Sequence, residues 1–265
     1  MPVTKKLPTI ANVTPGGRFV LTCPVGLSYG KVMFKMGGTT FDESHLSNID
    51  VKINGKVVQE FATGARLVQL NSYYGRPDNT ADGFLSVHFR RPELNPQWRA
   101  LPALGTADVD TLTIEGDIAA GASADLTLTA EAELYPAAPL GAFIKVREFP
   151  VSWPAGQYEW DSIPKGPRLV AAHLMDNDFT DAEMDLDGFK VFEGDKDQIQ
   201  AFQEEAEGKP RVPTAAMTSI DFLLSGEMGD ALVTSNVQDR RIRATKSAAA
   251  AADIVLEMLD GFQGI

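Results

Sequence analysis

Apolar and polar residues alternate along much of this chain, and the same alternating pattern occurs twice around similar turns. Residues 50–58 alternate around an Asn-Gly pair that begins at Asn54, and residues 183–191 alternate around an Asp-Gly pair that begins at Asp187. These pairs favour two-residue type I′ turns, because both central positions of such a turn need a positive φ. Each segment is therefore predicted to be a β-hairpin, and the two hairpins are separated by about 130 residues.

The repetition continues beyond the hairpins at nearly the same offset. Residues 83–89 match residues 217–223, and residues 124–128 match residues 252–256. A chain of 265 residues has room for two domains of ordinary size. The repeated pattern therefore predicts a duplicated β-domain that fills the chain.

Short strand-like segments, frequent turns and a linker-like stretch at residues 135–141 complete the pattern. Each half has about six to eight such segments and lacks the strand–helix–strand alternation of a parallel sheet. The predicted fold class is all-β: two tandem eight-stranded jelly-roll sandwiches, a double jelly roll, each with a short helical insertion. We expect the N-terminal jelly roll at residues 1–136 and the C-terminal jelly roll at residues 137–265.

Two segments change to the spacing of a helix, one after each hairpin. Residues 64–74 carry apolar side chains on one helical face, and Thr63 precedes them as a cap. Residues 195–207 form the clearer helix, because Asp195 and Gln198 have the spacing of a capping box. The predicted buried stripe of this second helix consists of Ile199, Phe202 and Ala206.

Composition narrows the possible functions. The net charge of −12 argues against a nucleic-acid surface, which needs clusters of Lys and Arg. The single cysteine, Cys23, excludes an intrachain disulfide. No apolar run approaches the ~18 residues of a membrane-spanning helix. The first ten residues lack the apolar core of a signal peptide, so we expect synthesis in the cytoplasm without general secretion.

A set of stretches follows the order found in one group of viral coat proteins. The strongest part is His-Phe-Arg-Arg-Pro-Glu at residues 88–93 followed by Ala-Leu-Gly-Thr at residues 103–106. The other matching stretches are residues 10–16, 24–29, 51–58, 168–173, 218–223 and 253–257. The chain resembles the double-jelly-roll major capsid proteins of the corticovirus type, from membrane-containing marine phages. It departs from them in an acidic segment at residues 176–187 and an alanine run at residues 248–252. These departures affect the expected loop contacts and not the expected architecture.

This resemblance implies a structural protein of the virion, not an enzyme, with no required cofactor. The protein is expected to form homotrimers, pseudo-hexagonal capsomers that tile an icosahedral shell over an internal lipid membrane. Its implied partners are further copies of itself, minor vertex or spike proteins, membrane proteins and the lipid bilayer, without direct contact to nucleic acid. Lys5 and Lys6 are predicted to lie near anionic headgroups of that membrane, and a solvated tail is the alternative.

The densest group of carboxylates suggests a cation site. Asp176, Asp178, Asp181 and Glu183 provide the oxygen ligands that calcium prefers, and corticovirus-like capsids are associated with calcium. The spacing is not that of an EF-hand loop. A solvated acidic loop is the alternative interpretation.

Three further residues are candidates for contacts between subunits. Arg90 and Arg91 end a predicted strand and can pair with carboxylates of a neighbouring copy, although an intrachain pair with Glu93 or solvation is an equal alternative. Trp98 lies in a loop and can anchor an interface, because tryptophan is enriched at such positions, or can pack in a core.

The remaining reactive side chains do not form a catalytic pattern. His88 and His173 lie in predicted strands and are interpreted as packing or hydrogen-bonding residues, and Cys23 as a buried inert thiol. No catalytic residue is proposed. Two other functions remain open: a glycan-acting enzyme with a double jelly roll, and a carbohydrate-binding virion spike, which would expose aromatic residues in a groove.

Overall fold

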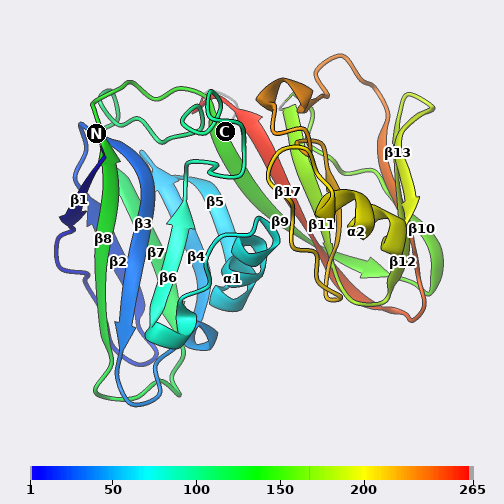
Figure 1. The fold of residues 1–265 in the computed structure, drawn as a ribbon. Coiled ribbons are helices and arrows are strands. Elements are labelled where there is room, and N and C mark those ends of the chain that lie inside the picture. Colours follow the sequence, from blue (N-terminus) through cyan, green and yellow to red (C-terminus); the bar gives the residue numbers. More distant parts are fainter. Residues whose placement is uncertain (1, 167, 263–265) are drawn as a thin grey trace.

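The structure is a computed structural model that describes residues 2–166 and 168–262. It shows two β-sandwiches side by side, which we call the N-terminal roll and the C-terminal roll (Figure 1). In the N-terminal roll one sheet has the order β1-β8-β3-β6 and the other the order β2-β7-β4-β5. The strands of this roll are β1 (Val3–Lys6), β2 (Arg18–Cys23), β3 (Ser28–Gly37), β4 (Leu46–Ile53), β5 (Lys56–Thr63), β6 (Phe84–His88), β7 (Leu112–Ile118) and β8 (Thr127–Tyr135).

The C-terminal roll repeats this connectivity. Its two sheets have the orders β9-β17-β11-β14 and β10-β16-β12-β13, and the short strand β15 pairs with β11 outside this path. The strands are β9 (Phe143–Trp153), β10 (Gly156–Trp160), β11 (Arg168–Met175), β12 (Phe179–Leu186), β13 (Phe189–Asp195), β14 (Thr218–Asp221), β15 (Leu232–Val233), β16 (Arg240–Lys246) and β17 (Ala250–Asp260). Setting β15 aside, each described roll places its first, eighth, third and sixth strands in one sheet, which is jelly-roll topology. The predicted double jelly roll is confirmed.

The two hairpin turns have the predicted geometry, and each also binds a neighbouring loop through hydrogen bonds. Asn54 and Asp187 have φ of 49° and 48°, and each is followed by a glycine with positive φ. The Asn54 Oδ1 atom accepts hydrogen bonds from the backbone N–H groups of Asp110 and Thr111, both at 2.9 Å. Asp187 Oδ1 accepts two backbone N–H groups in the same way, at residues 238 and 239. Each turn therefore also fixes the loop that leads into β7 or β16.

Replacing Asn54 by alanine is expected to lower the free energy of unfolding by about 1–2 kcal/mol, because two backbone donors lose their acceptor. Asn54→Asp keeps an acceptor oxygen at the same place, as Asp187 does in the C-terminal roll, and should cost less than half of this. Urea denaturation of the two variants measures the difference. Equal losses for both variants would show that the left-handed turn, and not the acceptor, is responsible.

The helices follow the hairpins as predicted, with two corrections. Helix α1 (Gly64–Tyr73) begins after Thr63, whose side chain accepts the backbone N–H of Arg66 at 3.0 Å. Helix α2 (Lys196–Glu204) begins after Asp195, but the Asp195 side chain makes no capping hydrogen bond, so the predicted capping box is wrong. Phe202 is 72% exposed and does not belong to the buried stripe. Short 3-10 helices lie at η1 (Glu43–His45), η2 (Thr80–Asp82) and η3 (Met228–Asp230).

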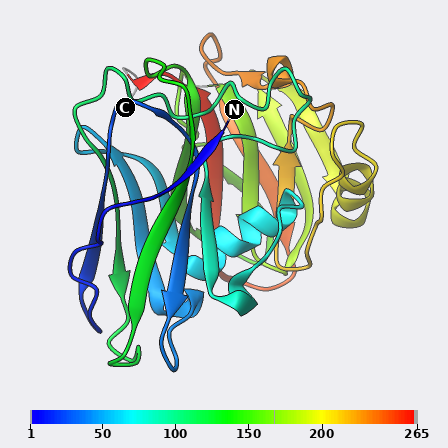
Figure 2. The same cartoon turned by 60° about the vertical axis from the view of Figure 1, so that its left-hand side comes forward.

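Helix α1 lies between the two rolls, whereas α2 lies on the outer side of the C-terminal roll (Figures 1 and 2). The two rolls also share a sheet, because β5 runs parallel to β9 with Gln59 opposite Val146. Strand β7 alternates strictly between buried and half-buried side chains, as expected for a sheet with one face in a core. Strand β11 is buried at every position after its first, because one face packs in its own roll and the other lies against the N-terminal roll. The joint between the rolls is therefore as buried as a core.

Candidate functional site

A cluster of buried polar side chains lies between the two rolls, and we call it the polar seam. Eighteen buried polar or charged residues are found in the described chain, and many of them gather here. The N-terminal roll supplies residues from the end of α1 and the loops on either side of β6, and the C-terminal roll supplies residues from β11, β14 and β17 and the loop after α2. The members are Tyr73, Tyr74, Arg76, Arg91, Glu93, His173, Arg211, Ser219, Asp221 and Glu257.

The centre of the polar seam is an ion pair that crosses between the rolls. The guanidinium of Arg91 donates to the carboxylate of Glu257 and, at 3.1 Å, to Glu93. The hydroxyl of Tyr74 also donates to Glu257, at 2.6 Å. The Arg91 guanidinium stacks over the Tyr74 ring at 4.6 Å, and Arg76 closes the group by donating to Glu93 at 2.8 Å. One carboxylate oxygen of Glu257, Oε2, thus accepts two donors from the opposite roll.

A second ion pair in the polar seam is fully removed from solvent. Arg211 Nε donates to Asp221 at 2.7 Å, and both side chains have no exposed area. The Tyr73 hydroxyl donates to the same carboxylate at 3.2 Å from the N-terminal roll. The carboxylate of Asp221 also accepts the backbone N–H of Leu223 at 2.8 Å. A buried charge is tolerated when its partners satisfy its hydrogen-bonding capacity in this way.

The ionisation states in the polar seam follow from burial and neighbouring charges. Burial alone would raise the pKa of Glu93, but Arg76 and Arg91 hold that pKa at about 2. The pKa of Glu257 is lowered by Arg91 against the opposing effect of burial. Burial lowers the pKa of His173, so its ring is neutral, and Nδ1 lies 2.8 Å from the Ser219 hydroxyl. The charged groups neutralise one another, and this arrangement fixes the two rolls in one relative position.

The shared sheet forms a second set of contacts between the rolls. Gln59 Nε2 donates to the carbonyl of Ile144 at 2.9 Å. Arg147 in β9 pairs with Glu60 in β5 at 3.2 Å. Glu148 accepts the backbone N–H of residue 62 at 2.8 Å and pairs with Arg66 of α1 at 3.1 Å. Strand β5 and the start of α1 are thus held along the edge of β9.

The predicted interface residues have intrachain partners. Of the alternatives for Arg91, the structure shows the intrachain pair with Glu93, and Arg91 is buried within one chain instead of facing a neighbour. Arg90 is partly exposed and contacts Glu133 at 3.5 Å. Trp98 is half-buried, and its Nε1–H donates to Glu227, so this loop of the N-terminal roll also contacts the C-terminal roll. Intersubunit functions of Arg90 and Trp98 stay predictions.

Lys5 and Lys6 lie in a strand, and not in the solvated tail predicted from the sequence as the alternative to membrane contact. Both Lys5 and Lys6 are exposed residues of β1, which pairs with β8 along its whole length. Strand β1 is the outer strand of its sheet among the described residues. The proximity of these lysines to a membrane stays a prediction. No helix in the described ranges has the length and apolar character needed to cross a bilayer.

The acidic residues predicted to bind calcium are spread along β12 and its preceding loop. Asp176 pairs with Lys246 at 2.7 Å, and Asp181 accepts the backbone N–H of Thr245 at 3.0 Å. Glu183 pairs with Lys190 at 3.2 Å. Within residues 2–166 and 168–262, no group of three or more His, Cys, Asp or Glu side chains has a metal-binding arrangement. Calcium binding by Asp176, Asp178, Asp181 and Glu183 stays a prediction.

Sequence reasoning did not identify the polar seam, although it placed Arg91 correctly beside Glu93 as one alternative. The sequence does carry a signal for the residues that the C-terminal roll contributes to the polar seam. His173 and Glu257 each interrupt an apolar run within a strand, and Asp221 ends the short strand β14, which is buried at every position. A charged residue on the outward face of a buried strand predicts a partner from another domain, because an unpaired charge there is costly. His173 and Cys23 are buried as the sequence predicted.

Comparison with solved structures supports the fold over the whole chain. The major capsid protein P2 from Bacteriophage PM2 aligns with a TM-score of 0.92 and 23% identity over 99% of this chain and 98% of that one. A structure of Sulfolobus Turreted Icosahedral Virus aligns at a TM-score of 0.69 and 13% identity, covering 97% and 90%. A capsid structure of the virus PBCV-1 aligns at 0.64 and 10% identity, covering 98% and 93%. No match was found among curated proteins.

Two jelly rolls in one chain, fixed together by a polar seam and a shared sheet, define the class of double-jelly-roll proteins. Family models show to which family of this class the chain belongs. The N-terminal domain of viral coat protein P2 matches residues 4–135, and its C-terminal domain matches residues 143–262. The chain belongs to the viral coat protein P2 family. It is a component of the virion capsid, as the sequence resemblance implied.

Proposed function

We propose that this coat protein is the major capsid subunit of a membrane-containing icosahedral phage and that it acts as a homotrimer with no enzymatic activity. The observation that carries the proposal is the fixed pairing of two similar rolls in one chain. Three copies of such a pair give six nearly equivalent units around a closed ring, and closed symmetry stops growth into a fibre. The net charge of −12 suits a shell that contacts other proteins and lipid instead of nucleic acid.

The alternative glycan-binding functions have less support. A carbohydrate groove would present exposed tryptophan rings, but Trp153 and Trp160 are buried in the C-terminal roll, and the exposed Phe202 ring lies in an apolar hollow. The indole of Trp98 is engaged with Glu227. The polar seam, which holds many of the buried charged side chains of the described chain, is closed to solvent. We therefore keep the structural function as the proposal, with lipid and minor vertex proteins as its expected partners.

The native mass of the purified protein tests this proposal. We expect light scattering to give about 86 kDa, three times the chain mass of 28.6 kDa. The same measurement with a calcium chelator, together with thermal unfolding, tests the predicted cation site. If calcium is bound by the folded protein, chelation should lower the unfolding temperature, and Asp178→Asn should remove that difference. A monomer at all concentrations would contradict the proposed capsomer.

A further inference from the structure

The two rolls can be matched residue by residue from contacts that recur in both. Asn71 of α1 donates its side-chain amide to the carbonyl of Ser86 at 2.8 Å. Gln203 of α2 donates in the same way to the carbonyl of Ser219 at 2.6 Å. Both side chains are buried. Helices α1 and α2, which begin at Gly64 and Lys196, are therefore counterparts with an offset of 132 residues.

The strands give the same match through their β-bulges. Strands β4 and β5 shift register after Val51, which pairs with Gln59, and β12 and β13 shift after Met184, which pairs with Phe192. Gln59 therefore corresponds to Phe192, and the next residue, Glu60, corresponds to Glu193. A bulge one residue long marks the same place in two hairpins, so this register does not depend on sequence similarity.

The first strand of each roll can be matched through the strand beside it. Pairing of β3 with β8 and of β11 with β17 shifts register at Gly30 and Val170, and this places Glu133 and Glu257 in equivalent positions. Their partners across the sheet are Thr4 in β1 and Val146 in β9. The next residues along these strands, Lys5 and Lys6, are therefore the counterparts of Arg147 and Glu148.

Two sheet edges of the rolls meet within the chain, and the two equivalent edges have no strand beside them in the described residues. Strand β5 of the N-terminal roll lies along β9 of the C-terminal roll. Their counterparts, β13 and β1, are the outer strands of their sheets in the described chain. They lie at opposite ends of the molecule, so they cannot meet within one copy (Figure 1). An unpaired strand edge is a template for a further strand.

We propose that β13 and α2 of one copy dock along β1 of a second copy, in the way that β5 and α1 dock along β9 within the chain. This inference rests on the proposed trimer and assigns its contact surface. The contact is head-to-tail, because it joins the C-terminal roll of one copy to the N-terminal roll of the next. Three such contacts close a ring in which every roll has the same kind of neighbour on each side.

The charges of the two free edges are complementary. Within the chain Arg147 pairs with Glu60, and the equivalent pair between copies is Lys5 with Glu193. Glu193, Asp195, Asp181 and Glu183 all line one shallow hollow of the C-terminal roll. Lys5 and Lys6 are exposed on β1. Two adjacent lysines on one edge thus match a group of carboxylates on the other.

The charge order at the start of the helix is reversed relative to the intrachain joint. Within the chain, Glu148 of β9 pairs with Arg66, the third residue of α1. Between copies the counterpart of Glu148 is Lys6, and the counterpart of Arg66 is Gln198, which is preceded by Asp197. At this position each roll edge therefore attracts its own partner and not the other one, whereas the Arg147–Glu60 and Lys5–Glu193 pairs have the same charge order. Such a reversal favours alternation of N-terminal and C-terminal rolls around the ring.

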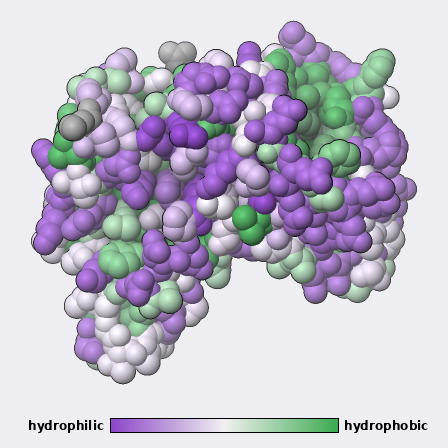
Figure 3. Space-filling model, viewed as in Figure 1, coloured by the Kyte–Doolittle hydropathy of each residue, from purple (hydrophilic) through white to green (hydrophobic). Residues whose placement is uncertain are grey.

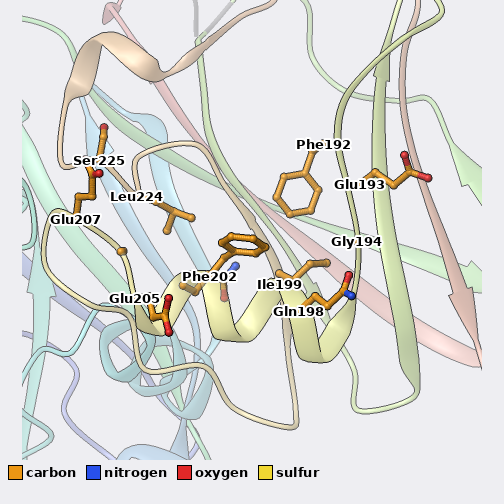
Figure 4. A pocket seen from close by; sticks show the side chains of 12 residues that line it. Phe192, Glu193, Gly194, Gln198, Ile199, Phe202, Glu205, Glu207, Leu224 and Ser225 are labelled. Carbon is orange, nitrogen blue, oxygen red and sulfur yellow. The ribbon is translucent and has the colours of Figure 1, made fainter.

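Apolar side chains that are covered in the N-terminal roll are left open in the C-terminal roll. Leu70 of α1 is 2% exposed, whereas its counterpart Phe202 of α2 is 72% exposed. Phe202 points from α2 into a hollow that Phe192, Ile199 and Leu224 also line (Figure 4). Figure 3 shows hydrophobic residues gathered on this side of the molecule, around β13 and α2. An open apolar patch bordered by charge is typical of a protein interface.

The proposal can be tested by crosslinking Lys5→Cys to Glu193→Cys. Both side chains are exposed, and the natural Cys23 is buried, so the variant should fold and react only at the new sites. We expect oxidation of the double variant to give covalent dimers and closed trimers on a non-reducing gel. Either single variant alone should stay monomeric on that gel, and a mixture of the two should give dimers. The matched control, Lys165→Cys with Glu193→Cys, should not form the closed trimer.

Charge exchange gives an independent measurement. Lys5→Glu or Glu193→Lys alone should weaken self-association about tenfold, and the double exchange should restore it to within about threefold of the natural protein. Sedimentation equilibrium measures these constants. Lys165→Glu carries the same charge change in a turn outside this surface and should have no effect.

The outcomes separate this inference from the proposed function. A natural trimer that is unaffected by the charge exchange and gives no crosslink would overturn the assigned surface but leave the trimer standing. A natural protein that remains monomeric would overturn both. If Lys5→Glu reduces sedimentation with phosphatidylglycerol vesicles and leaves the trimer unchanged, the lysines bind lipid, and the inference is wrong. Crosslinked trimers together with rescue by the double exchange would support it.

Discussion

Replacing Arg91 by methionine is expected to lower the free energy of unfolding by about 3–5 kcal/mol, the loss typical when one partner of a buried ion pair is removed. The Arg91 side chain is only 5% exposed and contacts both Glu257 and Glu93. Methionine fills most of the volume but leaves two carboxylates in a buried site with one fewer cation. Urea denaturation, followed by tryptophan fluorescence, measures the loss.

Arg90 provides the matched control for this prediction. It is the preceding residue, also pairs with a carboxylate, and is much more exposed. Arg90→Met should therefore cost less than about 1 kcal/mol, as is usual for pairs near the surface. The combined variant Arg91→Met with Glu257→Gln should be less destabilised than the sum of its single variants, because the second change removes the uncompensated charge. Similar losses for Arg90→Met and Arg91→Met would contradict the importance of the polar seam.

Lowering the pH from 6.5 to 4.5 is expected to destabilise the protein by up to about 1.4 kcal/mol per pH unit for each histidine that stays neutral when folded. Burial lowers the pKa of His173, and Arg91 and Arg211 lower it further against Glu257 and Asp221. Burial and then Arg76 lower the pKa of His88 to about 2. Below pH 6.5 the unfolded chain binds protons that the folded chain does not, so stability falls with the pH.

The carboxylates of the polar seam add a second loss at lower pH. The pKa of Glu93 is about 2 in the folded protein, so the stability that its ionised form contributes is present above about pH 4.5 and lost as the pH falls from there toward 2. Loss between pH 6.5 and 4.5 should therefore come from the histidines.

The variant His173→Gln separates the histidine effect from other titrations. The measured quantity is the slope of unfolding free energy against pH between 6.5 and 5, from urea denaturation at each pH. We expect this slope to fall by up to one proton equivalent in His173→Gln. Ser219→Ala is the control, because it removes the hydroxyl beside His173 and no titratable group. An unchanged slope in His173→Gln would mean that the ring binds protons equally in the folded and unfolded chains, and it would contradict the lowered pKa of His173.

The local pattern of the chain predicted the fold well, for a physical reason. Alternation, Asn-Gly and Asp-Gly turns and the Thr63 cap act within a few residues, and the structure has each of them in place. The duplication then required equivalent strands to occupy equivalent places. The weaker predictions were those for α2. Phe202 has helical spacing toward a core, but in the structure it lies in an open hollow on the outer side of the roll.

The polar seam was less predictable, because its partners are distant in the sequence. Arg91 and Glu257 are 166 residues apart, and Tyr73 and Asp221 are 148 apart. Nothing local indicates which carboxylate an arginine will reach across a domain interface. The acidic residues of β12 show the same limit. Their density along β12 and the loop before it predicts a cation site, but it does not indicate that Asp176 and Glu183 pair with Lys246 and Lys190, which lie later in the chain.

The joint between the rolls has a consequence for how a shell made of this protein can bend. Charged pairs, a continuous sheet and an apolar cluster that extends across both rolls hold their relative angle, so opening that angle would expose unpaired charges. One chain is therefore a rigid unit. In the proposed shell, curvature would have to arise at contacts between chains, where exposed side chains meet and small rotations cost little free energy.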